Sequence, residues 1–235
     1  DPPGSSGFRN DAAAMSLDQA GIIKMLQIAR YSVDQINSFE SSQRLVFQNS
    51  ENATEILHHF LVRAFRREVS NSQINQYLAI YDASINSGNS HEIAIKDALV
   101  AILTSPQFLY RVEQHQPDAR QSYRITSSEA ATRLSYFLWS SPPDEQLLNA
   151  GIQNKLVSSN ALEQQLPRML ESPKLREFAR NFGGQWLGFH EVISDQVISS
   201  GNNNVVKQRL AMYDEAVMYF EYLVRTNRSI FEIVQ

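Results

Sequence analysis

The stretch RLSYFLWSSPPDEQLL, residues 133–148, joins a dense apolar cluster to a proline break and then to a second helix-like pattern. Upstream of it, Thr126 and Glu129 have the spacing of a capping box, which predicts a helix that runs through the cluster. Pro142 and Pro143 cannot continue that helix, although proline suits the first turn of the next one. The stretch therefore predicts a helix–turn–helix corner, with the cluster at the buried C-terminal end of the first helix.

Three aromatic side chains dominate this cluster. We expect Tyr136, Phe137 and Trp139 to be mostly buried, with Trp139 contributing most, because apolar residues at helical spacing usually face a core. The alternative is an aromatic surface that binds a ligand, for which Tyr136, Trp139 and the more distant Trp186 are the candidates.

Helix signals recur along the rest of the chain, whereas the alternating pattern of strands is almost absent. The sequence predicts an all-α protein with a multi-helix orthogonal or bundle-like array. The expected helix starts are Ser16 with Gln19, Asn52 with Glu55, Ser70 with Gln73, Ser90, Ser105-Pro106 (continuing to Glu113), Asn160 with Glu163, and Ser172-Pro173.

Two long helices carry an apolar stripe on one face. The first is expected near the N-terminus and the second near the C-terminus, and each stripe follows spacings of three and four residues. Between them, Gly183 and Gly184 weaken a helix at a point where a backbone or a ligand could approach closely. The stripes consist of Ile22, Leu26, Ala29, Val33 and Ile36, and of Val206, Leu210, Tyr213, Val217, Phe220 and Val224.

The polar segment 115–122 contains a proline and predicts a linker between two helical subdomains, residues 1–114 and 123–235. An apolar segment ends at Gln235 without a helix cap, so we expect the second subdomain to be cut short there. The last long helix is then expected to need a following segment or a partner chain to bury its stripe fully.

Composition excludes several classes of protein. The net charge is −4 and no basic run occurs, which argues against nucleic acid as a partner. No apolar run approaches the roughly 18–20 residues that span a bilayer, so no membrane span is expected. The chain has no cysteine, which removes disulfides, thiol nucleophiles and covalent c-type haem attachment.

The sequence also lacks the common metal and catalytic motifs. Glu55 and His59 share a helical face, but no third ligand follows at helical spacing. We therefore expect no metal site and no cofactor in this chain, with haem expected only elsewhere in a parent protein.

Five charged residues stand in apolar surroundings, where a buried charge needs a partner. One interpretation is that they form ion pairs between helices, and we expect at least one such pair. The other is a pocket lined by arginine for a carboxylate or a phosphate. These residues are Arg66, Arg67, Arg111, Glu113 and Arg133.

Five blocks together carry a resemblance to a known group of proteins. The chain resembles planctomycete-type exported multidomain proteins of unknown function, which are often associated with c-type cytochrome domains. The blocks are GFRNDA at 7–12, AFRR at 64–67, LTSPQFLYRVE at 103–113, RLSYFLWSS at 133–141 and FGGQWLG at 182–188.

The resemblance implies a context rather than a reaction. It implies export to the periplasm, the cell surface or the medium, and contact with the rest of a parent polypeptide or with a cytochrome domain. The leading hypothesis is a helical scaffold or interaction module that does not itself carry the chemistry. The alternative is the N-terminal half of a catalytic unit, redox or hydrolytic, that acts on a polysaccharide.

Overall fold

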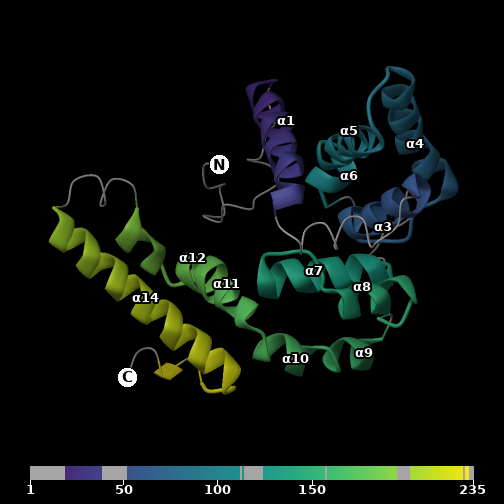
Figure 1. Ribbon diagram of the computed structural model, residues 1–235. Coiled ribbons are helices and arrows are strands. Elements are labelled where there is room, and N and C mark those ends of the chain that lie inside the picture. Colours follow the sequence, from purple (N-terminus) through teal and green to yellow (C-terminus); the bar gives the residue numbers. More distant parts are fainter. Residues whose placement is uncertain are drawn as a thin grey trace. The chain divides into compact units, whose positions relative to one another are not determined.

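The structure of the protein is a computed structural model (Figure 1). Its secondary structure is helical, and no strand occurs among the residues that the structure describes. The described residues are 19–38, 52–111, 113, 124–156, 158–194, 202–229 and 231–232. The predicted all-α class is confirmed.

The chain divides into two compact units. The first unit contains the described residues between 16 and 129 together with residues 148–154. The second unit contains residues 130–147 and the described residues between 155 and 235. The subdomain boundaries predicted from the linker stay a prediction.

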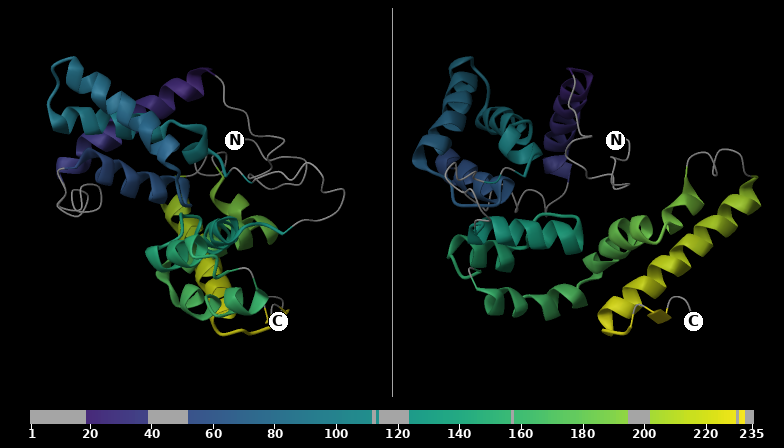
Figure 2. Two further views of the ribbon diagram at one scale, coloured as in Figure 1. Left: turned by 90° about the vertical axis from the view of Figure 1, so that its right-hand side faces the viewer. Right: turned by 180° about the vertical axis from the view of Figure 1, so that it is seen from behind.

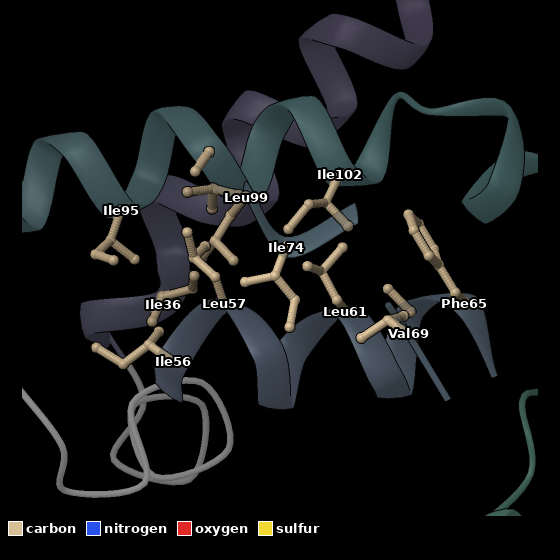
Figure 3. Packing of buried hydrophobic residues seen from close by; sticks show 13 residues of the cluster. Ile36, Ile56, Leu57, Leu61, Phe65, Val69, Ile74, Ile95, Leu99 and Ile102 are labelled. Atoms are coloured by element: carbon tan, nitrogen blue, oxygen red, sulfur yellow. The ribbon is translucent and has the colours of Figure 1, made fainter. Parts of the chain in front are cut away.

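The first unit packs its helices around one apolar core (Figure 3). Leu57 and Leu61 point from α3 toward Leu99 and Ile102 of α5, and Ile74 of α4 lies among them. The helices are α1 (Gln19–Asp34), α3 (Ala53–Phe65), α4 (Asn71–Asn86), α5 (His91–Leu103) and the short α6 (Pro106–Leu109).

Capping residues fix where these helices begin. Ser70 and Gln73 form the predicted capping box of α4, and the Ser90 side chain accepts from the backbone N–H of Ile93 at the start of α5. Ser105 caps α6, so the restart predicted at Ser105-Pro106 is confirmed. The predicted continuation to Glu113 is wrong, because α6 ends at Leu109.

The predicted stripe of α1 is only half correct. Ala29, Val33 and Ile36 are buried, but Ile22 is 55% exposed and Leu26 is 39% exposed. The buried residues lie in the C-terminal part of the helix and in the turn after it, and Val33 and Ile36 belong to the core shared with α3 and α5. The spacing of the stripe could not indicate how far along α1 this packing extends.

The second unit is a succession of helices in which the long α14 lies alongside α11, η4 and η5 (Figure 2). A continuous helical run begins at Pro173, after Ser172 accepts a hydrogen bond from the Lys174 N–H. Two helices, α7 and α8, contribute residues to both units. The elements are α7 (Ser127–Trp139), α8 (Glu145–Ile152), α9 (Ser159–Glu163), α10 (Leu166–Glu171), η3 (Pro173–Leu175), α11 (Arg176–Phe178), the π-helical η4 (Ala179–Gly183), α12 (Gly184–Trp186), η5 (Phe189–Ile193) and α14 (Asn203–Arg225).

One helix start in this unit differs from the prediction. Ser158, not Asn160, caps α9, and its side chain accepts a hydrogen bond from the Ala161 N–H at 3.2 Å. Both residues are good N-cap types, so their order could not be decided by residue type alone.

The two adjacent glycines lie where the helical run changes from π to α geometry. A Cβ atom at Gly183 would lie 2.9–3.1 Å from ring atoms of Phe220, so only glycine allows α14 to approach this closely. A close approach occurs at Gly183, but the approaching group is the Phe220 ring and not the predicted backbone or ligand.

The apolar stripe of α14 is buried over its C-terminal part. Tyr213, Val217 and Phe220 are buried, whereas Leu210 is 41% exposed. The described residues therefore bury this stripe only in part, and its burial by a following segment or a partner chain stays a prediction. Leu223 and Glu221 are also buried. Across the described part of the chain, none of the helices combines the length and the apolarity that crossing a bilayer requires.

Candidate functional site

The corner after α7 is built around Trp139. Its indole ring is 3% exposed, and its Nε1 donates a hydrogen bond to the main-chain oxygen of Met169 at 3.0 Å. Lys174 Nζ and Arg168 Cζ lie 5.0 Å and 5.8 Å from the ring centroid, within the range of a cation–π contact. The predicted burial of Trp139 is confirmed.

Asp144 holds the second half of the corner. Its Oδ1 accepts from the Leu147 N–H at 2.9 Å, which caps α8. The Arg168 guanidinium donates two hydrogen bonds to the same carboxylate, at 2.6 Å and 3.1 Å, in the bidentate geometry that arginine favours. Burial raises the pKa of Asp144, but the bonds from Arg168 and Leu147 outweigh it and leave this pKa below its ordinary value.

The other aromatic residues of the cluster are less buried than predicted. Tyr136 is partly buried, but Phe137 is 55% exposed, so the prediction for Phe137 is wrong. Its ring packs edge-on against Phe178 and Phe182, with centroids 5.0 Å and 5.9 Å away, and leaves one side open. Trp186 is 51% exposed and therefore belongs to the surface.

Phe178 and Phe182 stack almost in parallel, with an interplanar angle of 4°, and Phe182 also contacts Trp186 at 5.6 Å. The rings of Phe137, Phe178, Phe182 and Trp186 thus form a continuous set of contacts, called the aromatic row below. Beside it, the Asn181 amide donates to Ser140 Oγ at 2.8 Å.

A buried carboxylate on α14, which the sequence analysis missed, joins this helix to α11. Glu221 accepts hydrogen bonds from Arg176 at 2.9 Å and from Arg225 at 2.7 Å and 2.9 Å. Arg225 also donates to the main-chain oxygens of Leu170 and Ser172. The available signal was the pairing of Glu221 with Arg225 four residues later, next to the buried Phe220.

Burial raises the pKa of Glu221, while the hydrogen bonds from Arg176 and Arg225 lower it. The net result is a pKa below the ordinary value. This carboxyl is therefore ionised at neutral pH and serves as an anchor between helices.

Arg66 fills an analogous role in the first unit. It is 4% exposed and has a left-handed backbone with φ of 59° at the C-terminal cap of α3. Its guanidinium donates to the main-chain oxygens of Gln107, Phe108 and Tyr110 at 2.8, 3.2 and 3.1 Å. Because the last carbonyls of a helix lack partners within the helix, Arg66 caps the C-terminus of α6.

The remaining four charged candidates differ in burial. Arg67 follows Arg66 and is partly buried, while Arg111 is exposed two residues after α6. Glu113 is partly buried, and Arg133 is exposed on α7. The ion pair predicted among the five charged candidates stays a prediction. Arg66 donates hydrogen bonds to main-chain carbonyl oxygens, as described above.

No group of three or more metal-binding side chains lies close together within the part of the chain that the structure describes. His58 Nε2 lies 3.6 Å from Glu68, and the Tyr81 hydroxyl forms a hydrogen bond with His91 Nδ1 at 2.9 Å. Whether the chain binds metal or haem stays a prediction.

Comparison with known families gives two matches. Residues 52–113 match the family model PSD5, described as a protein of unknown function (DUF1595), and residues 125–235 match PSD4, described as a protein of unknown function (DUF1592). The two matches lie on either side of the predicted linker and agree with the resemblance to planctomycete-type proteins of unknown function. The comparisons with curated proteins and with solved structures found no match.

Proposed function

We propose that this chain is a helical scaffold or interaction module of an exported, cytochrome-associated multidomain protein. The observation that carries this proposal is that the charged and aromatic residues of its motifs join helices to one another. Arg66 caps a neighbouring helix, Asp144 pairs with Arg168, and Trp139 is buried between cations. Each of these groups holds one helix against another, which is the task of a scaffold.

The families matched do not contradict this proposal, because both are described as proteins of unknown function. Export and an association with a cytochrome domain rest on the resemblance of the sequence blocks. They belong to the proposal and not to the findings.

Elemental analysis and an absorption spectrum of the purified chain test the scaffold role. A scaffold is expected to contain no stoichiometric transition metal and to have no Soret band. Metal or haem at one equivalent per chain would contradict the proposal, because the chain would then carry a redox or hydrolytic centre itself.

A second candidate function is the binding of a polysaccharide by part of a catalytic unit. The exposed side of the aromatic row favours it, because sugar rings stack their apolar faces on exposed aromatic rings. Phe137 and Trp186 are 55% and 51% exposed, and the Asn181 amide and the Ser140 hydroxyl lie beside Phe137 and Phe182 along the chain.

Affinity electrophoresis in gels that contain soluble xylan or β-glucan tests this second candidate. Retardation that Trp186→Ala removes, and that Tyr222→Ala on α14 leaves intact, would support it. Tyr222 is a matched control because it is 46% exposed and lies away from the aromatic row in sequence. Equal migration in the presence and absence of each glycan would exclude these two ligands.

A further inference from the structure

The side of α14 that faces away from its neighbours in the second unit carries a further apolar stripe. It is formed by side chains that are 37–58% exposed, and we call it the outward stripe. Its first members are seven residues apart, and Tyr222 follows Tyr219 by three residues and Met218 by four, so helical geometry places them on one side of α14. The outward stripe consists of Val205, Met212, Met218, Tyr219 and Tyr222.

The other side of α14 is the one that packs within the second unit. Phe220 contacts Phe178 of α11, with ring centroids 6.0 Å apart. Tyr213 contacts Phe189 of η5, with ring centroids 5.8 Å apart. Tyr213 and Phe220 are buried, whereas the described residues leave every member of the outward stripe exposed. An exposed apolar stripe along a long helix is typical of an interaction surface.

Two charged residues accompany the outward stripe. Glu215 lies within it, three residues after Met212 and four before Tyr219. Arg209 lies at its edge, three residues before Met212. Glu215 is exposed, Arg209 is partly buried, and neither forms a hydrogen bond or an ion pair with another described residue. One acid and one base of α14 are therefore available to a partner along this stripe.

The other charges of α14 and of the turn after it do not disturb this arrangement. Lys207 and Asp214 lie on the side of the helix opposite to Met212 by helical spacing. Glu221 is buried in the network described above, and Arg228 pairs with Glu232 at 2.8 Å. The charge pattern of the stripe is thus set by Arg209 and Glu215.

We propose that the outward stripe binds the same stripe of a second copy of this chain, with the two α14 helices antiparallel. Such a pair has two-fold symmetry, so both copies use the same surface. With the axis at Met212, Arg209 lies opposite the partner's Glu215, and the symmetry forms this contact twice. Val205 then lies opposite the partner's Tyr219. A parallel pair would instead place Glu215 beside the partner's Glu215, so charge complementarity favours the antiparallel arrangement.

The expected dimer is weak. Helix α14 has 23 residues and is therefore about 35 Å long, and one helix pair of that length belongs to the small interfaces, below about 1,200 Å² in total. The net charge of −4 on each chain also opposes association. We expect a Kd of roughly 10–100 µM. The inference rests on the proposed interaction role and names the partner as a second copy.

Disulfide cross-linking tests the arrangement directly, because the chain contains no cysteine. Met212→Cys places one thiol per chain at the proposed axis, and oxidation at about 100 µM protein should join two chains covalently. Met218→Cys is the matched control, since Met218 is 58% exposed and Met212 is 54% exposed. Its two copies would lie about 18 Å apart along the antiparallel helices, so cross-linking should be at least about tenfold slower.

Sedimentation velocity of charge variants tests the pairing of Arg209 with Glu215. Arg209→Glu or Glu215→Arg alone should raise Kd about tenfold, because each places like charges opposite one another. The double variant Arg209→Glu, Glu215→Arg restores opposite charges and should return Kd to near the wild-type value. Lys207→Glu is the control, because it changes the net charge as Arg209→Glu does but lies on the opposite side of α14. Unchanged circular dichroism melting curves would show that the variants keep their fold.

Three results would overturn the inference. The first is a wild-type chain that stays monomeric up to about 500 µM, well above the expected Kd. The second is equal cross-linking of Met212→Cys and Met218→Cys, which would indicate a parallel pair or random collisions. The third is a charge-exchange variant that associates no better than Arg209→Glu alone. The scaffold proposal depends on metal and haem content, so it stands or falls separately.

Discussion

Trp139 Nε1 and the main-chain oxygen of Met169 are joined by a hydrogen bond of 3.0 Å, and both residues are buried. The bond ties the last residue of α7 to α10, thirty positions later in the chain. It also explains how the indole can be buried without leaving its N–H unsatisfied. The aromatic cluster at residues 134–139 is thus anchored by its last member.

Replacing Trp139 by alanine should lower the free energy of unfolding by about 3–5 kcal/mol, because a large ring and its hydrogen bond are both removed. Trp139→Phe keeps much of the apolar volume but leaves the Met169 oxygen without its donor, and should cost less. Urea unfolding followed by circular dichroism measures both. Trp186→Ala is the control, since its ring is 51% exposed, and a loss as large as that of Trp139→Ala would contradict this assignment.

Arg66 should contribute more to stability than Arg67. Arg66→Ala leaves the carbonyls of Gln107, Phe108 and Tyr110 without their shared donor, which should cost about 2–4 kcal/mol. Arg66→Gly should be less harmful than Arg66→Ala by about 1 kcal/mol, because glycine adopts the positive φ without strain. Thermal unfolding checks the order, with Arg67→Ala as control. Equal losses for the two alanine variants would show that Arg66 is not a special cap.

Acid should weaken the second unit through Glu221. The ordinary pKa of this carboxyl is 4.5, and its arginine partners hold the folded value lower. Its stabilising effect is therefore complete above pH 4.5 and is lost as the pH falls through the lower, folded-state pKa. Asp144 has an ordinary pKa of 3.8, also lowered, and acts in the same direction. Stability measured by urea unfolding should fall as the pH drops below about 4.5.

The isosteric variant Glu221→Gln separates the role of this residue from general acid effects. It should lower stability at neutral pH by about 1–3 kcal/mol, because Arg176 and Arg225 lose their charged acceptor. It should also flatten the fall in stability below pH 4.5 relative to wild type. A variant whose stability profile keeps the wild-type slope would rule out Glu221 as a source of the acid effect.

Local signals in the sequence predicted the helix starts well. Ser70 with Gln73 and Thr126 with Glu129 form the predicted capping boxes, with the Thr126 N–H donating to Glu129 at 2.7 Å. Such contacts join residues three apart, so the sequence contains all of the information needed. The same reason explains why the Ser105-Pro106 restart was correct.

Long-range contacts were harder to predict. Helical spacing predicted that Phe137 is buried, but it is 55% exposed, since spacing cannot show where a neighbouring helix ends. Glu221 was missed because its partner Arg176 lies 45 residues away, and nothing local requires that contact. Arg66 was identified as a charge in apolar surroundings, but its carbonyl partners on α6 could not be inferred from residue types.

The close approach of α14 to Gly183 gives the last prediction. A Cβ at this position would lie 2.9 Å from Phe220 Cδ1, so Gly183→Ala should cost about 1–3 kcal/mol through overpacking. Combining it with Phe220→Leu should cost less than the sum of the two single changes, because the smaller side chain removes the clash. Urea unfolding of the two single variants and the double variant gives this coupling. Gly88→Ala is the control, as no atom lies within 4 Å of its added Cβ and only its φ of +89° creates strain. Strict additivity between Gly183→Ala and Phe220→Leu would mean that the two residues are not in contact in solution.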